Sequence, residues 1–194
     1  MPAVQDMPEL PEAPDVLERV KQLIVDFDEA IDQRVDRVRG HQTIDRVMYG
    51  ASELGDWSLL WHLLGVGQAL LPGRDAMTAV RFSAILGAES LLVNGAVKSL
   101  FNRHRPVWEE DRPRPHRIRR PVTSSFPSGH ASAAFTAAGV LSQGDPLWPL
   151  YYGLAAVVAS SRVYVKMHHA SDVIAGAAIG VGLATFARRR LRKP

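Results

Sequence analysis

The stretch FPSGHASAAFTAAGVL, residues 126–141, decides how this chain folds. Its proline, serine and glycine lead into His130, and a run of mostly small apolar residues follows directly. Such an alanine-rich run favours a helix, so we expect one over residues 131–141. A turn at the start of that helix presents free backbone N–H groups beside a hydroxyl and an imidazole. These groups are suited to holding and protonating an anion.

Four more apolar stretches flank this segment, separated by polar turns: residues 57–71, 76–101, 147–165 and 173–187. The stretch 76–101 is long enough to cross a bilayer, which takes about 20 residues. Trp148, Tyr151 and Tyr152 open the stretch 147–165, a pattern typical of a membrane interface. The sequence therefore predicts an all-α fold, a polytopic transmembrane helical bundle of about five spans. Because several stretches are short for a span, a soluble helical bundle is the alternative.

Arg81 and Glu89 interrupt the longest apolar stretch, ahead of Lys98 near its end. They are eight residues apart and share roughly one helix face, so we expect both to point into the bundle, away from lipid. Three glycines in the last stretch, Gly176, Gly180 and Gly182, allow close contact between helices. We interpret them as packing positions rather than as a phosphate-binding loop.

The N-terminal part of the chain differs in composition from the rest. Residues 1–14 are acidic and proline-bearing, which predicts a disordered tail, and they lack the pattern of a signal peptide. In residues 15–54, apolar side chains recur at helical spacing from Val16 to Val38, and Gly40 follows as a stop. This predicts an amphipathic helical N-terminal segment. We expect its apolar face to pack against the domain rather than to lie in the membrane, because its polar face is not predominantly basic.

Basic residues are unevenly distributed along the chain, whose net charge is only +3. They concentrate in residues 103–120 and in a basic C-terminal tail, residues 188–194, and such patches suit phosphates, anionic lipid headgroups or nucleic acid. Neither aromatic interleaving nor zinc-finger spacing accompanies them, so we expect no nucleic-acid partner. The arginines of the loop 107–126 form either a solvated basic loop or a guide for lipid headgroups. The chain has no cysteine, which excludes disulfides and thiolate chemistry.

Polar residues at helical spacing lie on both sides of the central segment. Lys98 and Arg105 are seven residues apart, so both project from one helix face, and Pro106 marks the exit into a loop. His168 and Asp172 are four residues apart, which puts an imidazole and a carboxylate on one face. We expect Asp172 to accept a hydrogen bond from one ring N–H and so fix the tautomer. Together these residues indicate a phosphoryl-transfer site on membrane helices.

Three blocks in a fixed order carry a family resemblance: Lys98 with Arg105-Pro106, then Pro127-Ser128-Gly129-His130, then Ser161-Arg162 with His168 and Asp172. This order and spacing resemble the three-part motif of the type 2 phosphatidic acid phosphatase superfamily. That superfamily includes bacterial membrane lipid phosphatases, glucose-6-phosphatase and vanadium haloperoxidases. The resemblance covers residues 55–187, which it identifies as a membrane phosphatase domain. Many membrane members have one span more than we count here.

The resemblance implies catalytic roles for three residues. His168 attacks phosphorus and forms a phosphohistidine, Asp172 orients His168, and His130 protonates the leaving oxygen and then activates water. The resemblance also implies a set of groups that hold the phosphate oxygens: Lys98, Arg105, Arg162, the Ser128 hydroxyl and the Gly129 N–H. Three cations with N–H donors stabilise the transferred group, so we expect neither a metal nor a cofactor. A divalent metal bound by the histidines and Asp172 is the alternative, which the cations disfavour.

The implied function is that of an integral-membrane phosphatase for a lipid phosphomonoester or pyrophosphate, of the phosphatidate, phosphatidylglycerophosphate or polyprenyl phosphate type. One alternative is a polyprenyl pyrophosphate phosphatase of cell-wall carrier recycling. Others are a non-catalytic binder of anionic lipids and a vanadate-using haloperoxidase. Two other histidines, His62 and His169, are expected to take no part in the chemistry. We expect the bacterial cytoplasmic membrane as the location, and the arginines on the site side favour a site that faces the cytoplasm.

Overall fold

The computed structural model describes residues 15–107 and 122–191. They form helices joined by turns: α1 (Val16–Asp36), α2 (Gln42–Gly55), η1 (Asp56–Ser58), α3 (Leu59–Ala69), α4 (Ala76–Ser90), η2 (Leu91–Val97), α5 (Gly129–Leu141), α6 (Trp148–Tyr164) and α7 (Ala170–Leu191). Because no strand occurs in the described part of the chain, the predicted all-α fold is confirmed. The predicted disordered tail, most of the arginine-rich loop 107–126 and the last residues of the basic tail lie outside the described residues.

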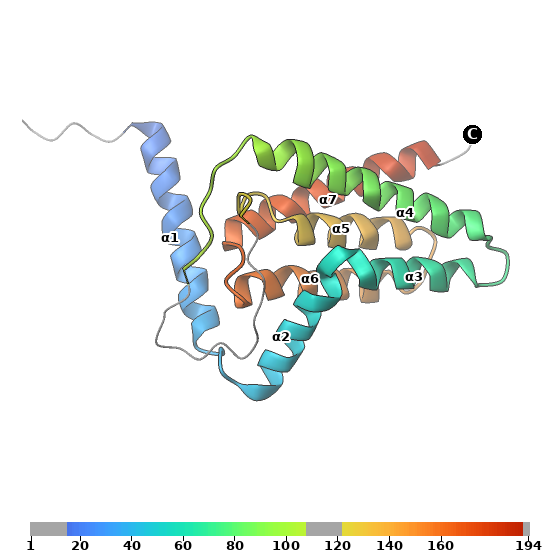
Figure 1. Cartoon of the computed structure of the whole chain (residues 1–194), viewed down its shortest axis with the longest axis horizontal. Coiled ribbons are helices and arrows are strands. Elements are labelled where there is room, and N and C mark those ends of the chain that lie inside the picture. The colour runs from blue at the N-terminus through green and yellow to red at the C-terminus, as the bar shows by residue number, and fades with distance from the viewer. Residues whose placement is uncertain (1–14, 108–121, 192–194) are drawn as a thin grey trace, which may run out of the picture.

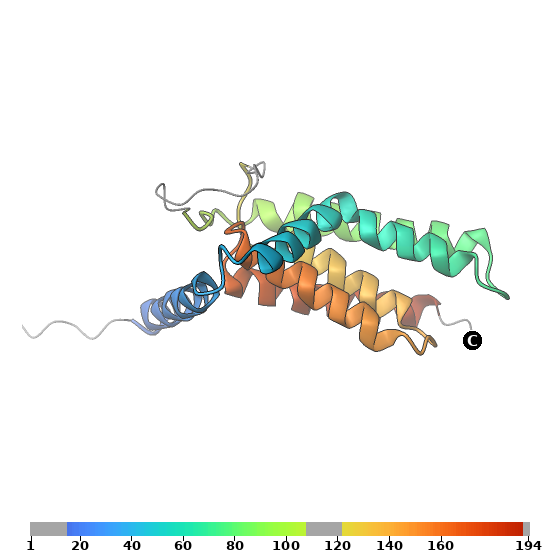
Figure 2. The same cartoon turned by 90° about the horizontal axis from the view of Figure 1, so that it is seen from below.

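Helices α3 to α7 run side by side and form the bundle (Figure 1). Seen from below, α3 and α4 form one layer, and α5, α6 and α7 form the other (Figure 2). Trp61, Phe82 and Leu86 of the first layer meet the alanines of α5 and Tyr151 of α6 in the core between the layers. The small side chains of α5 let α4, α6 and α7 approach it closely, and α5 is therefore the centre of the bundle.

Two of the three glycines of α7 seat that helix against α5. A β-carbon on Gly176 would collide with the carbonyl oxygen of Ser128, and one on Gly180 would collide with that of Ser132. The packing role predicted for these two glycines is confirmed. Gly182 faces open space, so the same prediction is wrong for it. The close contact holds the first turns of α7 against the start of α5.

Two segments of the described chain are long and apolar enough to cross a membrane: Ala76–Val97, which joins α4 to η2, and Ala170–Arg190 in α7. Helices α3, α5 and α6 have 11, 13 and 17 residues. All three are shorter than the stretch of about 20 residues that a full span takes. The helical bundle is thus established, and the number of spans stays a prediction.

The helix that begins at Ala76 changes its geometry midway, because η2 is a π-helix. In an uninterrupted α-helix of about 3.6 residues per turn, Glu89 and Lys98 would point in opposite directions. The wider turns of η2 bring both side chains to one cavity. Glu89 is buried as predicted, whereas Arg81 is exposed, so the prediction that both point into the bundle is wrong for Arg81. Arg81 precedes Glu89 by eight residues, which is about 12 Å along a helix. It therefore lies nearer the end of the bundle that is opposite the Glu89 cavity.

Helix α1 lies across the end of the bundle (Figure 1). Many of its large apolar side chains are exposed, among them Val16, Leu17, Val20 and Leu23. The buried residue of α1 is Asp28, and polar contacts attach the helix. Just after α1, Arg39 donates hydrogen bonds to the carbonyls of Val163 and Tyr164 at 2.9 and 2.8 Å. The prediction that the apolar face packs on the domain is therefore wrong for most of α1, because ion pairs and hydrogen bonds on its polar face fix its orientation.

Candidate active site

A cavity of about 490 Å³ lies among α3, α4, η2, the start of α5 and the loop between α6 and α7. Six of the eight site residues predicted from the sequence line it: Lys98, Arg105, Gly129, His130, Arg162 and His168. The other two, Ser128 and Asp172, are fully buried. The fold thus gathers three sequence blocks at one end of the bundle.

His168 is buried in the loop between α6 and α7. Its backbone N–H donates to the Arg162 carbonyl at 3.1 Å, which closes this loop. Its Nδ1 atom lies 2.6 Å from the Ser125 carbonyl oxygen. A carbonyl can only accept, so Nδ1 carries the proton and Nε2 keeps its lone pair. Burial lowers the pKa of His168 well below its usual value, and the imidazole is therefore a neutral potential nucleophile.

Asp172 does not bind His168 in the way that the spacing predicts. Its Oδ2 atom lies 3.8 Å from Nδ1 of His168, too far for a hydrogen bond, while Ser125 takes the ring proton. Oδ1 of Asp172 instead accepts from Arg103 at 2.5 Å, and Oδ2 accepts from the backbone N–H of His169 at 2.9 Å. The predicted direct hydrogen bond is therefore wrong. The negative charge of Asp172 still lies close enough to stabilise a positive charge on the ring.

His130, the second residue of α5, pairs with a residue that the sequence did not single out. Its Nε2 atom lies 2.8 Å from Oδ1 of Asp56, between α2 and α3. This hydrogen bond holds the pKa of Asp56 below its usual value, so Asp56 is a carboxylate. It favours a proton on His130 and opposes burial, which lowers the pKa of that imidazole. Trp57 and Ser58 follow with left-handed φ angles of 54° and 57°. Such a strained turn persists where its surroundings require it, and here it presents Asp56 to α5.

Three cations from different parts of the fold line the cavity: Lys98, Arg105 and Arg162. The helix that carries Lys98 ends at Ser99 and Arg105 lies in the loop after it, so the prediction that both project from one helix face is wrong. The Nζ atom of Lys98 donates to Oδ1 of Asn94 at 3.2 Å, and burial lowers the pKa of Lys98 to about 8. Nη1 of Arg105 donates to the Met167 carbonyl at 2.7 Å and lies 3.4 Å from Nε2 of His168. A guanidinium is thus fixed beside the potential nucleophile, where it can hold an anion.

Arg162 lies on α6 and is almost completely buried. Its Nη1 atom donates to the hydroxyl of Ser52 on α2. Its Nε atom has no hydrogen-bond partner among the described residues. A buried guanidinium with an unused donor, in a residue that lines the cavity, is suited to binding an anion.

Ser128 and Gly129 form the start of α5. The Ser128 hydroxyl accepts from the Ala131 N–H at 3.4 Å and caps the helix. A β-carbon on Gly129 would collide with Oδ1 of Asn94, so glycine is required for this close approach. The free N–H groups of a helix start favour an anion, as the sequence predicted for this turn.

Arg103 and Asp28 join the site although no motif block predicts them. Nη1 of Arg103 bonds Asp172, and Nη2 lies 2.6 Å from Oδ2 of Asp28 on α1. Asp28 also accepts from the N–H and the hydroxyl of Ser171, each at 2.7 Å. The position of Arg103, two residues before Arg105 in the first block, is the one signal that could have indicated it.

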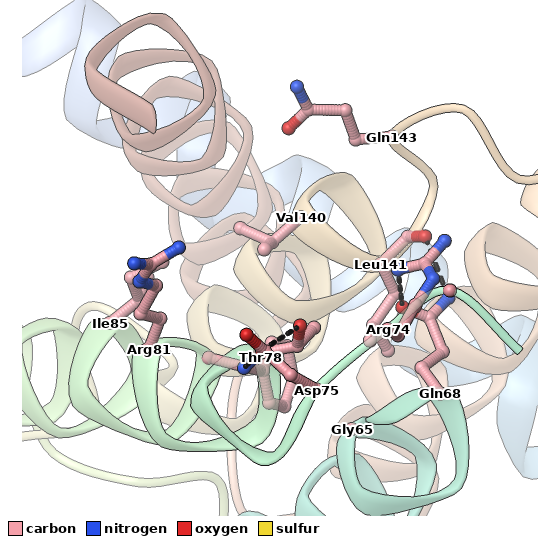
Figure 3. Close-up of a pocket in the computed structure, with 12 residues that line it drawn as sticks. Gly65, Gln68, Arg74, Asp75, Thr78, Arg81, Ile85, Val140, Leu141 and Gln143 are labelled. Atoms are coloured by element: carbon pink, nitrogen blue, oxygen red, sulfur yellow. Dashed lines mark hydrogen bonds between the residues drawn. The ribbon is translucent and has the colours of Figure 1, made fainter. Parts of the chain in front are cut away.

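A second cavity, of about 550 Å³, lies between the α3–α4 turn and the end of α5 (Figure 3). There Gln68 donates to the Leu141 carbonyl at 2.9 Å and to Asp145 at 2.8 Å. Arg74 in turn donates to Gln68 at 3.0 Å. These bonds tie the turn to the end of α5. Since none of the predicted site residues lines this cavity, we assign it a structural role.

Comparisons of the sequence with known proteins agree with the resemblance that the motif indicated. A model of the PAP2 superfamily matches residues 78–193. A decaprenylphosphoryl-5-phosphoribose phosphatase of Mycobacterium tuberculosis is 30% identical over 152 residues, which are 74% of this chain and 82% of the relative. An undecaprenyl-diphosphatase of Sulfolobus acidocaldarius is 43% identical over 63 residues, 31% of either chain.

Two solved structures have a similar fold. A transmembrane PAP2 type phosphatidylglycerolphosphate phosphatase from Bacillus subtilis superimposes with a TM-score of 0.68 at 23% identity, covering 90% of this chain and 89% of that chain. LpxE from Aquifex aeolicus superimposes with a TM-score of 0.65 at 26% identity, covering 82% and 93%. These likenesses extend over most of each molecule and so include both layers of the bundle.

Proposed function

The chain belongs to the PAP2 superfamily, and from this membership we propose that it removes phosphate from a membrane lipid through a phosphohistidine intermediate and without a metal. Its matched relatives are phosphatases of lipid phosphates, and the chain is a phosphatase of that class.

In the first proposed step, the lone pair of His168 Nε2 attacks phosphorus, and the bond from phosphorus to the lipid oxygen breaks. His130 gives its proton to that oxygen, so the lipid leaves as an alcohol. The new N–P bond makes the ring of His168 positive, with the charge of Asp172 close by. In the second step, His130 takes a proton from water, whose oxygen attacks phosphorus. The N–P bond breaks, its electron pair returns to Nε2 of His168, and inorganic phosphate leaves.

The cations supply the charge stabilisation that phosphoryl transfer requires. Lys98, Arg105 and Arg162 line the cavity, and Gly129 lines it at the start of α5. We propose that they hold the non-bridging phosphate oxygens together with the Ser128 hydroxyl. Three fixed cations neutralise the anion and repel a further cation, so a metal is not required.

The orientation of the His168 ring is the single observation that carries this proposal. The bond to Ser125 fixes Nδ1 as the donor and leaves Nε2 at 3.4 Å from Nη1 of Arg105. A phosphate oxygen bound by that guanidinium would bring phosphorus within reach of Nε2. His130 lies in the same cavity with a carboxylate partner, as a general acid requires.

The names of the relatives guide the choice of substrate. They act on a decaprenyl-linked phosphoribose, an undecaprenyl diphosphate and phosphatidylglycerolphosphate. We propose a lipid phosphomonoester of the polyprenyl or phosphatidylglycerophosphate type for this chain. A polyprenyl diphosphate is the second candidate, favoured by the similarity to the undecaprenyl-diphosphatase.

We further propose that residues 55–187 form the phosphatase domain, with a helical segment over 15–54 and a basic tail over 188–194, in the bacterial cytoplasmic membrane. The two apolar segments that are long enough to span support membrane insertion. The exposed apolar side chains of α1, which lies across the site end of the bundle, support a helix on the membrane surface.

A panel of lipid phosphates assayed with the purified full-length protein in detergent tests the function. We expect phosphate release with EDTA present, and inhibition by vanadate, which mimics the five-coordinate transition state. Dependence on an added metal would refute the metal-independent mechanism. Binding of anionic lipids without release of phosphate from any substrate would favour the non-catalytic alternative.

A further inference from the structure

Glu89 on α4 has a buried carboxyl group for which the mechanism has no use. Only 3% of the residue is exposed, and it lines the same cavity as His130 and Lys98. Neither carboxyl oxygen has a hydrogen-bond partner among the described residues. The Ser132 hydroxyl is a neighbouring donor, yet no hydrogen bond of normal geometry joins it to this carboxyl group in the described chain. A buried acceptor without a donor is unfavourable and calls for a partner from outside the chain.

Lys98 does not provide that partner. Its Nζ atom donates to Oδ1 of Asn94 at 3.2 Å, and within the described chain it forms no hydrogen bond with Glu89. The π-helical turns between Glu89 and Lys98 bring both to the cavity without joining them. The cavity therefore offers a cationic part, for the phosphate, and a separate acceptor.

Further polar side chains line the cavity on the side of α3, α4 and η2. His62 Nδ1 lies 3.0 Å from the Ser83 hydroxyl, and Asn94 Nδ2 donates to the Ser90 hydroxyl at 3.2 Å. All four residues line the cavity together with Glu89. Hydroxyl, amide and imidazole groups around a carboxyl suit a ligand that carries hydroxyls, because each can donate or accept. An acyl or polyprenyl chain would leave the Glu89 carboxyl without a donor.

We propose that Glu89 accepts a hydrogen bond from a hydroxyl of the substrate headgroup, next to the carbon that carries the phosphate. This inference rests on the proposed phosphatase function and narrows its substrate to a lipid-linked phosphomonoester of a polyol, such as a glycerol or a sugar. His130 serves the leaving oxygen from the same cavity, so the polyol attached to that oxygen is the part of the substrate that reaches Glu89.

When it is ionised, the same carboxyl group disfavours a diphosphate. In a diphosphate the leaving oxygen belongs to a second phosphate, which would bring its negative charge to the side of Glu89. Like charges repel strongly in a desolvated cavity. This repulsion would make the protein select a phosphomonoester over a diphosphate of the same lipid.

The wild-type protein provides the first test, since it requires no variant to fold. The quantity measured is kcat/KM for phosphate release in detergent from a lipid with a glycerol phosphomonoester and from its deoxy analogue, which lacks the adjacent hydroxyl. The same comparison between a lipid-linked pentose phosphate and its deoxy analogue shows which polyol fits better. We expect each deoxy analogue to be about tenfold poorer, because the buried carboxyl is then left without a donor. Equal kcat/KM values within both pairs would overturn the proposal.

Two substitutions of Glu89 distinguish the effect of its hydrogen-bond acceptor from the effect of its negative charge. Glu89→Met removes both, and we expect the preference for the hydroxyl to disappear. Glu89→Gln keeps an acceptor and removes the charge, so it should retain part of that preference while use of a polyprenyl diphosphate rises about tenfold relative to the monoester. Glu18→Met, an exposed residue at the start of α1 that pairs with Lys21, is the matched control and should keep the wild-type ratios.

The outcomes distinguish this inference from the function on which it rests. Hydrolysis of every substrate, with the same ratios in Glu89→Met as in the wild type, would overturn the inference and leave the phosphatase function standing. Failure of the wild type to hydrolyse any lipid phosphate would overturn both.

Discussion

The carboxylate of Asp28 lies 2.6 Å from Nη2 of Arg103, and this contact joins the N-terminal helix to the surroundings of the proposed nucleophile, His168. The other end of the same guanidinium bonds Asp172 at 2.5 Å. Asp28 also accepts from the N–H and hydroxyl of Ser171, so the first turn of α7 is held from outside the bundle. Helix α1, which carries Asp28, precedes residues 78–193, the part of the chain that the PAP2 model matches.

Replacing Asp28 by asparagine should lower kcat about tenfold, because Arg103 loses a charged acceptor and no longer holds Asp172 in position. The side chain of Asp28 is 4% exposed, so water cannot readily replace it. KM should change little, since Asp28 does not line the substrate cavity. Steady-state kinetics of phosphate release, with a thermal melt beside them, measure both effects.

The matched control is Asp26→Asn, which removes an exposed carboxylate on the same helix that bonds Gln22. It should leave kcat and the melting temperature unchanged. If Asp28→Asn kept the wild-type kcat, or if kcat fell only in proportion to the loss of folded protein, the positioning role of Asp28 would be wrong.

Asp56→Asn should lower kcat about tenfold, because an amide cannot hold the proton on His130 as a carboxylate does. The substitution removes the negative charge from the 2.8 Å contact with Nε2 of His130 and keeps the size of the side chain. Glu53→Gln, an exposed residue on α2, is the control. An unchanged kcat in Asp56→Asn would mean that His130 does not depend on this partner.

The helices and the cavity could be predicted because their signals are local. Apolar stretches fixed the positions of α3 to α7, and the spacing of Lys98, Arg105, His130, Arg162 and His168 indicated residues that do line one cavity. The orientation of α1 could not be predicted, since it depends on ion pairs with residues more than seventy positions away. Periodicity shows which face of a helix is apolar, and it does not show which face the fold covers.

The partners of the proposed catalytic side chains could not be predicted, for the same reason. Asp56 meets His130 across 74 residues, and the Ser125 carbonyl meets His168 across 43. Backbone carbonyls have no side-chain signature at all, so the Ser125 contact has no trace in the sequence. The four-residue spacing of His168 and Asp172 suggested a direct bond, but Arg103 and the His169 N–H occupy the carboxylate oxygens.

His168→Ala should lower the rate at least about a thousandfold, because the proposed nucleophile is removed. Its neighbour provides the control. His169 Nε2 lies 3.2 Å from the His104 carbonyl, outside the cavity lining, so His169→Ala should keep most of the activity. Labelled phosphate bound to protein during turnover should appear in the wild type and in His169→Ala and be absent from His168→Ala. Substantial turnover by His168→Ala would assign the nucleophile elsewhere.

Lys98 should set an alkaline limit on activity. Burial lowers its pKa to about 8, so above this pH the free enzyme loses a positive charge from the phosphate site, and kcat/KM should fall. Arginine keeps its charge at any pH in this range, and Lys98→Arg should therefore move the decline to higher pH. The measurement is kcat/KM from pH 6 to about 10 for both proteins. Superimposable alkaline limbs would assign the decline to another group.

The proposed site lies at one end of the bundle, and the side of the membrane that each end faces can be measured. The α6–α7 loop and α1 lie at the site end, and the α3–α4 turn lies at the other end (Figure 1). Arg37, Arg39 and Arg46 belong to the segment between α1 and α2 or to α2 itself, near the site end. Positive residues prefer the cytoplasmic side, so we expect the site to face the cytoplasm.

Single cysteines report the side cleanly, because the chain has no cysteine of its own. Arg74→Cys places a thiol in the α3–α4 turn, and Glu18→Cys places one on α1 at the site end. With a cytoplasmic site, a membrane-impermeant maleimide should label Arg74→Cys in intact cells and Glu18→Cys only after permeabilisation. The reverse labelling pattern would place the site outside the cell. The positive charges of the segment after α1 would then lie on the outer side, against their usual preference. Phosphatase activity of both variants must match the wild type, so that the labelled protein is the folded one.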